Sequence, residues 1–196
     1  PFINIDNDEI REVNNQMGNF AGLVFEDWSL SNSSFRVFEN DGIMSICQLN
    51  CDMYDGMCVN AVTIDINEGK VLSNKEIMDL VGYTEDQLYT DASATIENML
   101  VNDYGLDEET RNDRISNDSE GYFADALEKT FSKEVLNSNM IMFIGPDGTL
   151  CLCSKIVSMG GPLTTTEIYD VNGNMWTMPG CGYAIDTFGD IIVPNN

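Results

Sequence analysis

A tight turn in the first quarter of the chain constrains the fold most strongly. Two strand-like runs of alternating character, SFRVF and IMSICQL, flank Asn40-Asp41-Gly42. An Asp-Gly pair readily adopts the left-handed backbone of a two-residue hairpin turn, and the alternation suits strands with one buried face. A third such run, CVNAVTIDI at residues 58–66, follows and ends at Asn67-Glu68-Gly69. The region therefore predicts an antiparallel meander.

Helical patterns lie on both sides of this meander. Before it, from Asn7 or Asp8, apolar residues recur at helical spacing at Ile10, Val13, Met17, Phe20 and Val24. After it, two capping boxes, Ser73-x-x-Glu76 and Thr84-x-x-Gln87, predict helix starts. The second of these helices would bury one face, formed by Leu88, Ala92, Ile96, Met99 and Leu100. Another helix is indicated by Phe123, Ala126, Leu127 and Phe131.

Strand patterns return in the last third, with hairpin turns expected at Pro146-Asp147-Gly148 and Asn172-Gly173. The acidic stretch LDEETRNDRISNDSEG, residues 106–121, favours a loop or irregular turn. Strands and helices in blocks predict an α+β fold, with antiparallel sheets or hairpins and about four helices packed on them, rather than a doubly wound parallel sheet. We expect residues 1–70 (helix plus meander) and 71–196 (helices plus hairpins) to pack as one compact unit.

The charge of the chain limits its partners. The chain contains nine Lys and Arg residues and 33 Asp and Glu residues, which gives a formal net charge of −24. Nucleic acid and anionic lipid are poor partners, because binding to either depends on clustered cations. A basic protein, in contrast, would be attracted.

The absence of histidine removes most familiar catalytic groups. Ser-His-Asp triads, Cys-His pairs and HExxH zinc sites are excluded, and no GxSxG or SxxK motif is present. We therefore expect no catalytic residues, no cofactor and no metal. A carboxylate enzyme is the remaining catalytic alternative, and it needs two acidic side chains about 5 to 9.5 Å apart across a cleft.

The six cysteines are Cys47, Cys51, Cys58, Cys151, Cys153 and Cys181. Small buried thiols on strands are favoured, since free cysteine is commonly buried. A Cys51–Cys58 bridge is the second interpretation, and closing that loop would stabilise the fold by about 2.5 kcal/mol. A thiolate metal site ranks third, because no CxxC pair and no histidine ligand exist.

Acidic turns and tryptophans have two interpretations each. The turns at Asp6, Asp52, Asp65 and Asp170 could suggest Ca²⁺, but none has the ligand set of an EF-hand, so we expect Asx-stabilised turns. Trp28 and Trp176 favour core positions over an exposed contact patch.

Three ordered segments resemble one known family. They are PFINIDNDEIREVNNQM (1–17), AVTIDINEGKVLSNKEIMDLVG (61–82) and FIGPDGTLCLCSKIVSMGG (143–161). Together they are similar to an extracytoplasmic domain found in the Gram-positive anti-sigma factor RsiV and beside the catalytic domain of the deacetylase PdaC. Glu68 replaces the usual Thr before Gly69-Lys70, and the final Tyr-rich segment is replaced by KIVSMGG.

The resemblance implies a non-catalytic binding or sensor domain outside the cytoplasm, anchored to a membrane only through a segment upstream of Pro1. It also implies a cationic protein such as lysozyme as the partner. The alternative is an accessory module of a peptidoglycan-modifying enzyme that binds cell-wall glycan. Two loops are expected to contact the partner, and their candidate residues are Asp52, Tyr54, Asp55, Asp107, Glu108, Glu109, Asp118 and Glu120.

Overall fold

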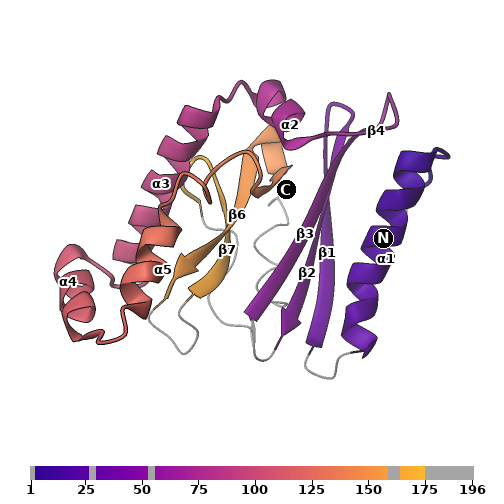
Figure 1. Ribbon diagram of the computed structural model, residues 1–196. Coiled ribbons are helices and arrows are strands. Elements are labelled where there is room, and N and C mark those ends of the chain that lie inside the picture. Colours follow the sequence, from indigo (N-terminus) through magenta and orange to yellow (C-terminus); the bar gives the residue numbers. More distant parts are fainter. Residues whose placement is uncertain (1–2, 27–29, 53–55, 159–163, 175–196) are drawn as a thin grey trace.

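A computed structural model describes residues 3–26, 30–52, 56–158 and 164–174. These residues form an α+β fold with five helices and two antiparallel sheets, which confirms the predicted fold class. Figure 1 shows four layers in the order α1, first sheet, second sheet, and the helices α3 and α5. None of the helices in the described ranges is long and apolar enough to cross a membrane.

The first sheet is the predicted meander. It contains β1 (Leu30–Asn40), β2 (Ile43–Asp52), β3 (Gly56–Asp65) and the short β4 (Lys70–Val71), paired in that order. Asn40 pairs with Ile43 across the first turn. Asp41 and Gly42 both have positive φ, 51° and 82°, as a two-residue hairpin turn requires. The second turn is held by Asp65, whose Oδ1 accepts hydrogen bonds from the backbone of Asn67 and Glu68.

Helix α1 (Asp8–Glu26) covers the outer face of the first sheet. Its start is fixed by Asn7, whose side chain accepts a hydrogen bond from the Ile10 amide at 2.8 Å. The buried residues of this layer come from α1, the preceding segment and the sheet: Ile3, Ile10, Val13, Met17, Ile46 and Ile64. The side chains of Phe20 and Val24 lie outside the described residues.

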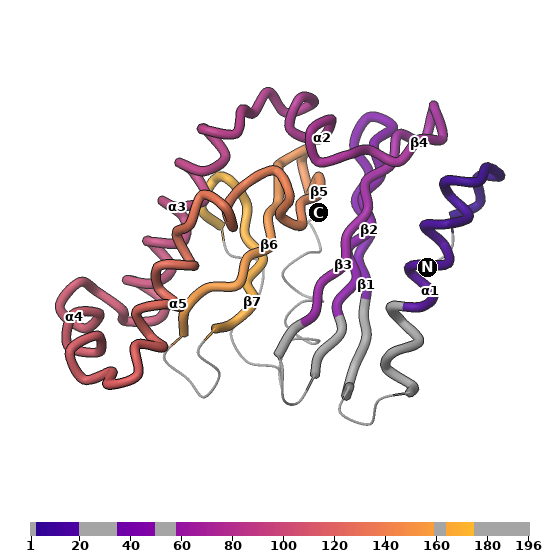
Figure 2. Tube along the Cα trace, in the orientation of Figure 1, coloured from indigo at the N-terminus to yellow at the C-terminus, as the bar shows by residue number. Residues whose placement is uncertain are grey.

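The second sheet contains β5 (Ile141–Ile144), β6 (Leu150–Val157) and β7 (Thr164–Asp170), with β6 in the centre (Figure 2). The predicted turn between β5 and β6 is a short 3-10 segment, η1 (Pro146–Gly148). After β7, Asp170 Oδ1 accepts hydrogen bonds from the amides of Asn172 and Asn174. That turn is therefore Asx-stabilised, as expected. Any strand beyond Asn174 lies outside the described residues.

Three helices cover the outer face of the second sheet: α2 (Asn74–Val81), α3 (Glu85–Asn102) and α5 (Tyr122–Thr130). Both predicted capping boxes are present, at the starts of α2 and α3. The five predicted core residues of α3 are all buried, and they pack in one cluster with Leu150, Leu152 and Ile156 of β6.

The inner faces of the two sheets share a second core. Adjacent residues of β2 show this directly, because Ile46 packs with α1 whereas Cys47 packs with Phe143 and Cys151 of the second sheet. The rings of Phe38 and Phe143 stack with centroids 5.8 Å apart. Residues before and after position 70 therefore contribute to one core.

The structure also shows the state of four cysteines. Cys47, Cys151 and Cys153 are buried free thiols, as the favoured interpretation predicted. Burial raises the pKa of all three thiols, that of Cys153 to about 12, so they stay protonated at neutral pH.

The second interpretation, a Cys51–Cys58 bridge, is wrong, because Cys58 is a free, exposed thiol. The strand register explains this, since Cys58 lies opposite Asn50 while Cys51 lies opposite Met57. The two cysteines are therefore not directly opposite each other in the strand register. The Cys51 side chain and Cys181 lie outside the described residues.

Candidate functional site

The acidic stretch after α3 contains a helix, which corrects the expectation of a loop. Helix α4 spans Glu108–Asn117 and has no buried residue. Asp107 caps it by accepting a hydrogen bond from the Thr110 amide at 2.8 Å. That hydrogen bond lowers the pKa of the Asp107 carboxyl. Figure 1 places α4 beside α3 and α5, at the end of the view opposite α1.

Arg111 attaches α4 to α3. Its guanidinium forms two hydrogen bonds with the Glu97 carboxylate, one of them 2.8 Å long. Only 15% of the Arg111 side chain is exposed. A paired, largely buried guanidinium holds two helices together with good geometry.

Arg114 attaches the same helix to α5. Its guanidinium lies over the Phe123 ring, 5.5 Å from the ring centre. Both cations of α4 therefore point toward the rest of the molecule, and apolar residues do not form its inward face.

The outward surface of α4 is consequently acidic. Glu108, Glu109, Asp113 and Glu120 are all exposed. A shallow hollow of about 520 Å³ is lined by Asp107, Glu108, Glu109 and Asn112. Its three carboxylates come from one turn of chain rather than from opposing walls. We call Glu108, Glu109 and Asp113 of α4, together with Glu120 in the turn that follows the helix, the acidic face.

The predicted contact residues in this region divide into two groups. Glu108, Glu109 and Glu120 are exposed and belong to the acidic face. Asp107 and Asp118 have structural roles instead, since Asp107 caps α4 and Asp118 accepts hydrogen bonds from the amides of Gly121 and Phe123 at the start of α5. Asp113 was not among the residues singled out from the sequence. Asp113 follows Glu109 by four residues, a spacing that places two side chains on the same face of a helix, and this was the signal in the sequence that could have identified it.

The other predicted loop is only partly described. Asp52 is the last residue of β2 and pairs with Gly56 of β3, but its side chain lies outside the described residues. Tyr54 and Asp55 also lie outside them. In the described ranges, no group of three or more Cys, Asp or Glu side chains is arranged to hold a metal ion.

Exposed aromatic residues bear on the glycan alternative. Within the described part of the chain, Phe35 on β1 and Tyr122 on α5 are the aromatic side chains with large exposure. Strand β1 belongs to the first sheet, whereas α5 packs against the second sheet (Figure 1). The two rings therefore do not form one glycan-binding platform. Trp28 and Trp176 lie outside the described residues.

Comparison with protein-family models finds no family that matches this chain, and comparison with curated proteins finds no match either. The resemblance to the RsiV and PdaC domain family therefore stays a prediction.

Proposed function

We propose that this chain is a non-catalytic extracytoplasmic binding or sensor domain that recognises a basic protein through the acidic face, which α4 and the turn after it present. The observation that carries the proposal is the division of charge on this helix. Arg111 and Arg114 both contact neighbouring helices and are only partly exposed. The most exposed charged side chains between residues 108 and 120 are those of the acidic face, and all four are negative.

Physical reasoning supports such a role. A chain of net charge −24 attracts cationic proteins over a long range and speeds their encounter at low salt. Charged groups that are already held in place lose little freedom on binding, and complementary charges favour one orientation of the partner. Helix α4 offers such a surface, because Arg111 and Arg114 fix its position without occupying its acids.

The family resemblance adds a specific partner to this proposal. It favours a lysozyme, a small and strongly basic protein, and a location outside the cytoplasm with an anchor upstream of Pro1. The acidic face would suit other basic proteins on charge alone, so the experiment must separate selective recognition from general attraction.

The test is a calorimetric titration of the chain with a basic lysozyme at low and at near-physiological salt. The Debye length shortens to about 8 Å at physiological ionic strength, which screens exposed charges that are not in contact. We expect one-to-one binding that weakens with salt but survives at the physiological concentration. A second basic protein of similar size should bind only at low salt. Equal behaviour of the two proteins, or no heat with either, would overturn the lysozyme proposal.

A further inference from the structure

Strand β6 extends beyond its neighbour β5. The two strands pair from Ile144 opposite Leu150 to Ile141 opposite Cys153, whereas β6 continues to Val157 and remains paired with β7 throughout. Residues 154–157 of β6 therefore have a strand partner on one side only. An unpaired strand edge presents backbone donors and acceptors to an incoming strand.

The hydrogen-bond pattern identifies which backbone groups face the open side. The Gly145 amide donates to the Thr149 carbonyl, so the backbone groups of Thr149 point toward β5. The Val157 amide donates to Thr130 Oγ1 on the same side of β6. The Val171 amide bonds to the Leu150 carbonyl on the β7 side. Because backbone groups alternate along a strand, the N–H and C=O of Lys155 point to the open side. No described residue bonds to them.

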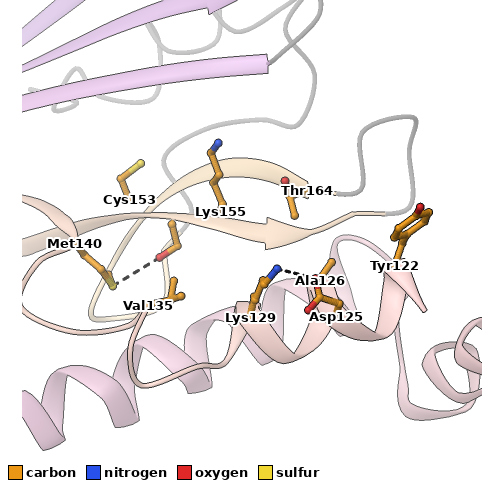
Figure 3. A pocket seen from close by; sticks show the side chains of 10 residues that line it. Tyr122, Asp125, Ala126, Lys129, Val135, Met140, Cys153, Lys155 and Thr164 are labelled. Atoms are coloured by element: carbon orange, nitrogen blue, oxygen red, sulfur yellow. Dashed lines mark hydrogen bonds and ion pairs between the residues drawn. The ribbon is translucent and has the colours of Figure 1, made fainter. Parts of the chain in front are cut away.

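A pocket of about 510 Å³ runs along this open edge. Figure 3 shows Val135, Ala126 and Lys129 on the side of β6 that faces α5, and Cys153 and Lys155 on the opposite side. Ala126, Val135 and Met140 form an apolar wall of the pocket. The Lys129 ammonium is paired with Asp125 at 2.6 Å, so it neutralises that carboxylate rather than facing the pocket alone.

Within the described part of the chain, Lys155 differs from the other lysines in its contacts. Four lysines each pair with a carboxylate in the described ranges: Lys70, Lys75, Lys129 and Lys133. Lys155 is in none of the ion pairs formed between residues of the described ranges. It is exposed and lines the pocket. A carboxylate from outside the chain would complement this ammonium.

We propose that the open edge of β6 binds an extended peptide in which one acidic residue lies between two β-branched apolar residues. The peptide backbone would form both hydrogen bonds with Lys155, as in β-strand addition. Side chains alternate between the faces of an added strand. The acidic side chain therefore lies opposite Lys155, and its two apolar neighbours face Ala126, Val135 and Met140.

The probe is an acetylated and amidated peptide, Thr-Val-Glu-Val-Thr, titrated at near-physiological salt and followed by amide chemical shifts. We expect the largest shifts at Lys155 and its strand neighbours. Lys155→Gln should weaken binding about fivefold, the effect of one exposed ion pair. Lys75→Gln removes another exposed lysine, on α2, and should leave binding unchanged.

Two matched peptides test the geometry. A peptide with Lys in place of Glu should bind about fivefold more weakly to the unmodified chain and regain affinity for Lys155→Glu. A peptide with Pro in place of Glu lacks the central donor and should not bind. The proposal is overturned by absence of shifts at millimolar peptide, by shifts centred elsewhere, or by equal binding of the Glu and Lys peptides. In those cases Lys155 only protects the strand edge from association.

Discussion

Helices α3 and α4 follow one another in the chain, and both carry several acidic residues, yet they are attached to the molecule in different ways. Helix α3 buries six residues, and these include five that pack into the core under the second sheet. Helix α4 buries none and is attached by Arg111 and Arg114. Burial of apolar area stabilises α3, whereas charge contacts position α4.

The difference separates stability from recognition. A helix held by its apolar face can lose exposed charges without changing the fold, but it must keep its buried residues. A helix held by two arginines keeps almost all of its own surface available. The acids of α4 can therefore be changed for binding while α3 maintains the fold, and the following substitutions test this division.

The largest effect is expected from the same substitution placed on each helix. Ile96 of α3 is fully buried, whereas Ile115 of α4 is 40% exposed. Ile96→Ala should lower the free energy of unfolding by about 3 kcal/mol through lost burial and the cavity left behind. Ile115→Ala should change it by less than about 0.5 kcal/mol. Denaturant unfolding measures both. Equal losses would show that α4 is part of the core.

The next effect is expected at the link between the two helices. Arg111→Gln removes a partly buried pair, so it should cost about 1 to 2 kcal/mol, between the values for exposed and buried pairs. The loss should appear mainly as faster hydrogen exchange of the α4 amides. Arg11→Gln breaks an exposed pair with Asp6 and Asp8 and serves as the control. Unchanged exchange in α4 after Arg111→Gln would mean that another contact holds the helix.

A smaller effect should follow from pH, because the two helices differ in their caps. The α3 cap is neutral, Thr84 with Gln87, whereas Asp107 caps α4 as a carboxylate. Its pKa lies below the ordinary 3.8 in the folded chain. The contribution of this cap is therefore complete above pH 3.8 and is lost as the pH falls through the lower, folded pKa.

Helix α4 should consequently fray in acid at its first turn, while the first turn of α3 keeps its cap. Carbon chemical shifts at pH 5 and pH 2 would measure both. Asp107→Asn is the matched variant, because asparagine caps as well as aspartate but carries no charge. If the variant frays with pH as much as the unmodified chain, titration of Asp107 is not the cause.

The smallest effect on stability is expected from the acidic face itself. The triple variant Glu108→Gln, Glu109→Gln and Glu120→Gln changes only exposed side chains, so unfolding should shift by less than about 0.5 kcal/mol. Part of that shift would come from Glu108 and Glu109, which favour the first turn through the helix dipole. A larger loss, measured by denaturant unfolding, would give these acids a structural role.

Local signals in the sequence predicted much of the fold. The turn at Asp41-Gly42 and both capping boxes depend on neighbouring residues, so they could be identified without tertiary information. Helix α4 was not predicted from the sequence, because its inward face is formed by Arg111 and Arg114 and therefore has no apolar periodicity. Its cap was present in the sequence as Asp107, three residues before Thr110.

The candidate sites required the structure for similar reasons. The sequence indicated an acidic surface, but only the contacts of Asp107 and Asp118 show that these two residues are caps. The open edge at Lys155 depends on where β5 ends relative to β6, which is a matter of long-range pairing. The stacking of the two sheets through Cys47 and Phe143 is likewise set by contacts about 100 positions apart in the sequence.

The most direct test of the central proposal uses two triple variants of equal charge. Glu108→Gln, Glu109→Gln and Glu120→Gln neutralise three acids of the acidic face, and Glu12→Gln, Glu39→Gln and Glu68→Gln neutralise three exposed acids on or beside α1 and the first sheet. Each would be titrated with a basic lysozyme at near-physiological salt. We predict that the first variant loses at least tenfold in affinity, about 1.4 kcal/mol, and that the second binds like the unmodified chain. Equal losses would contradict recognition through α4 and leave only general charge attraction.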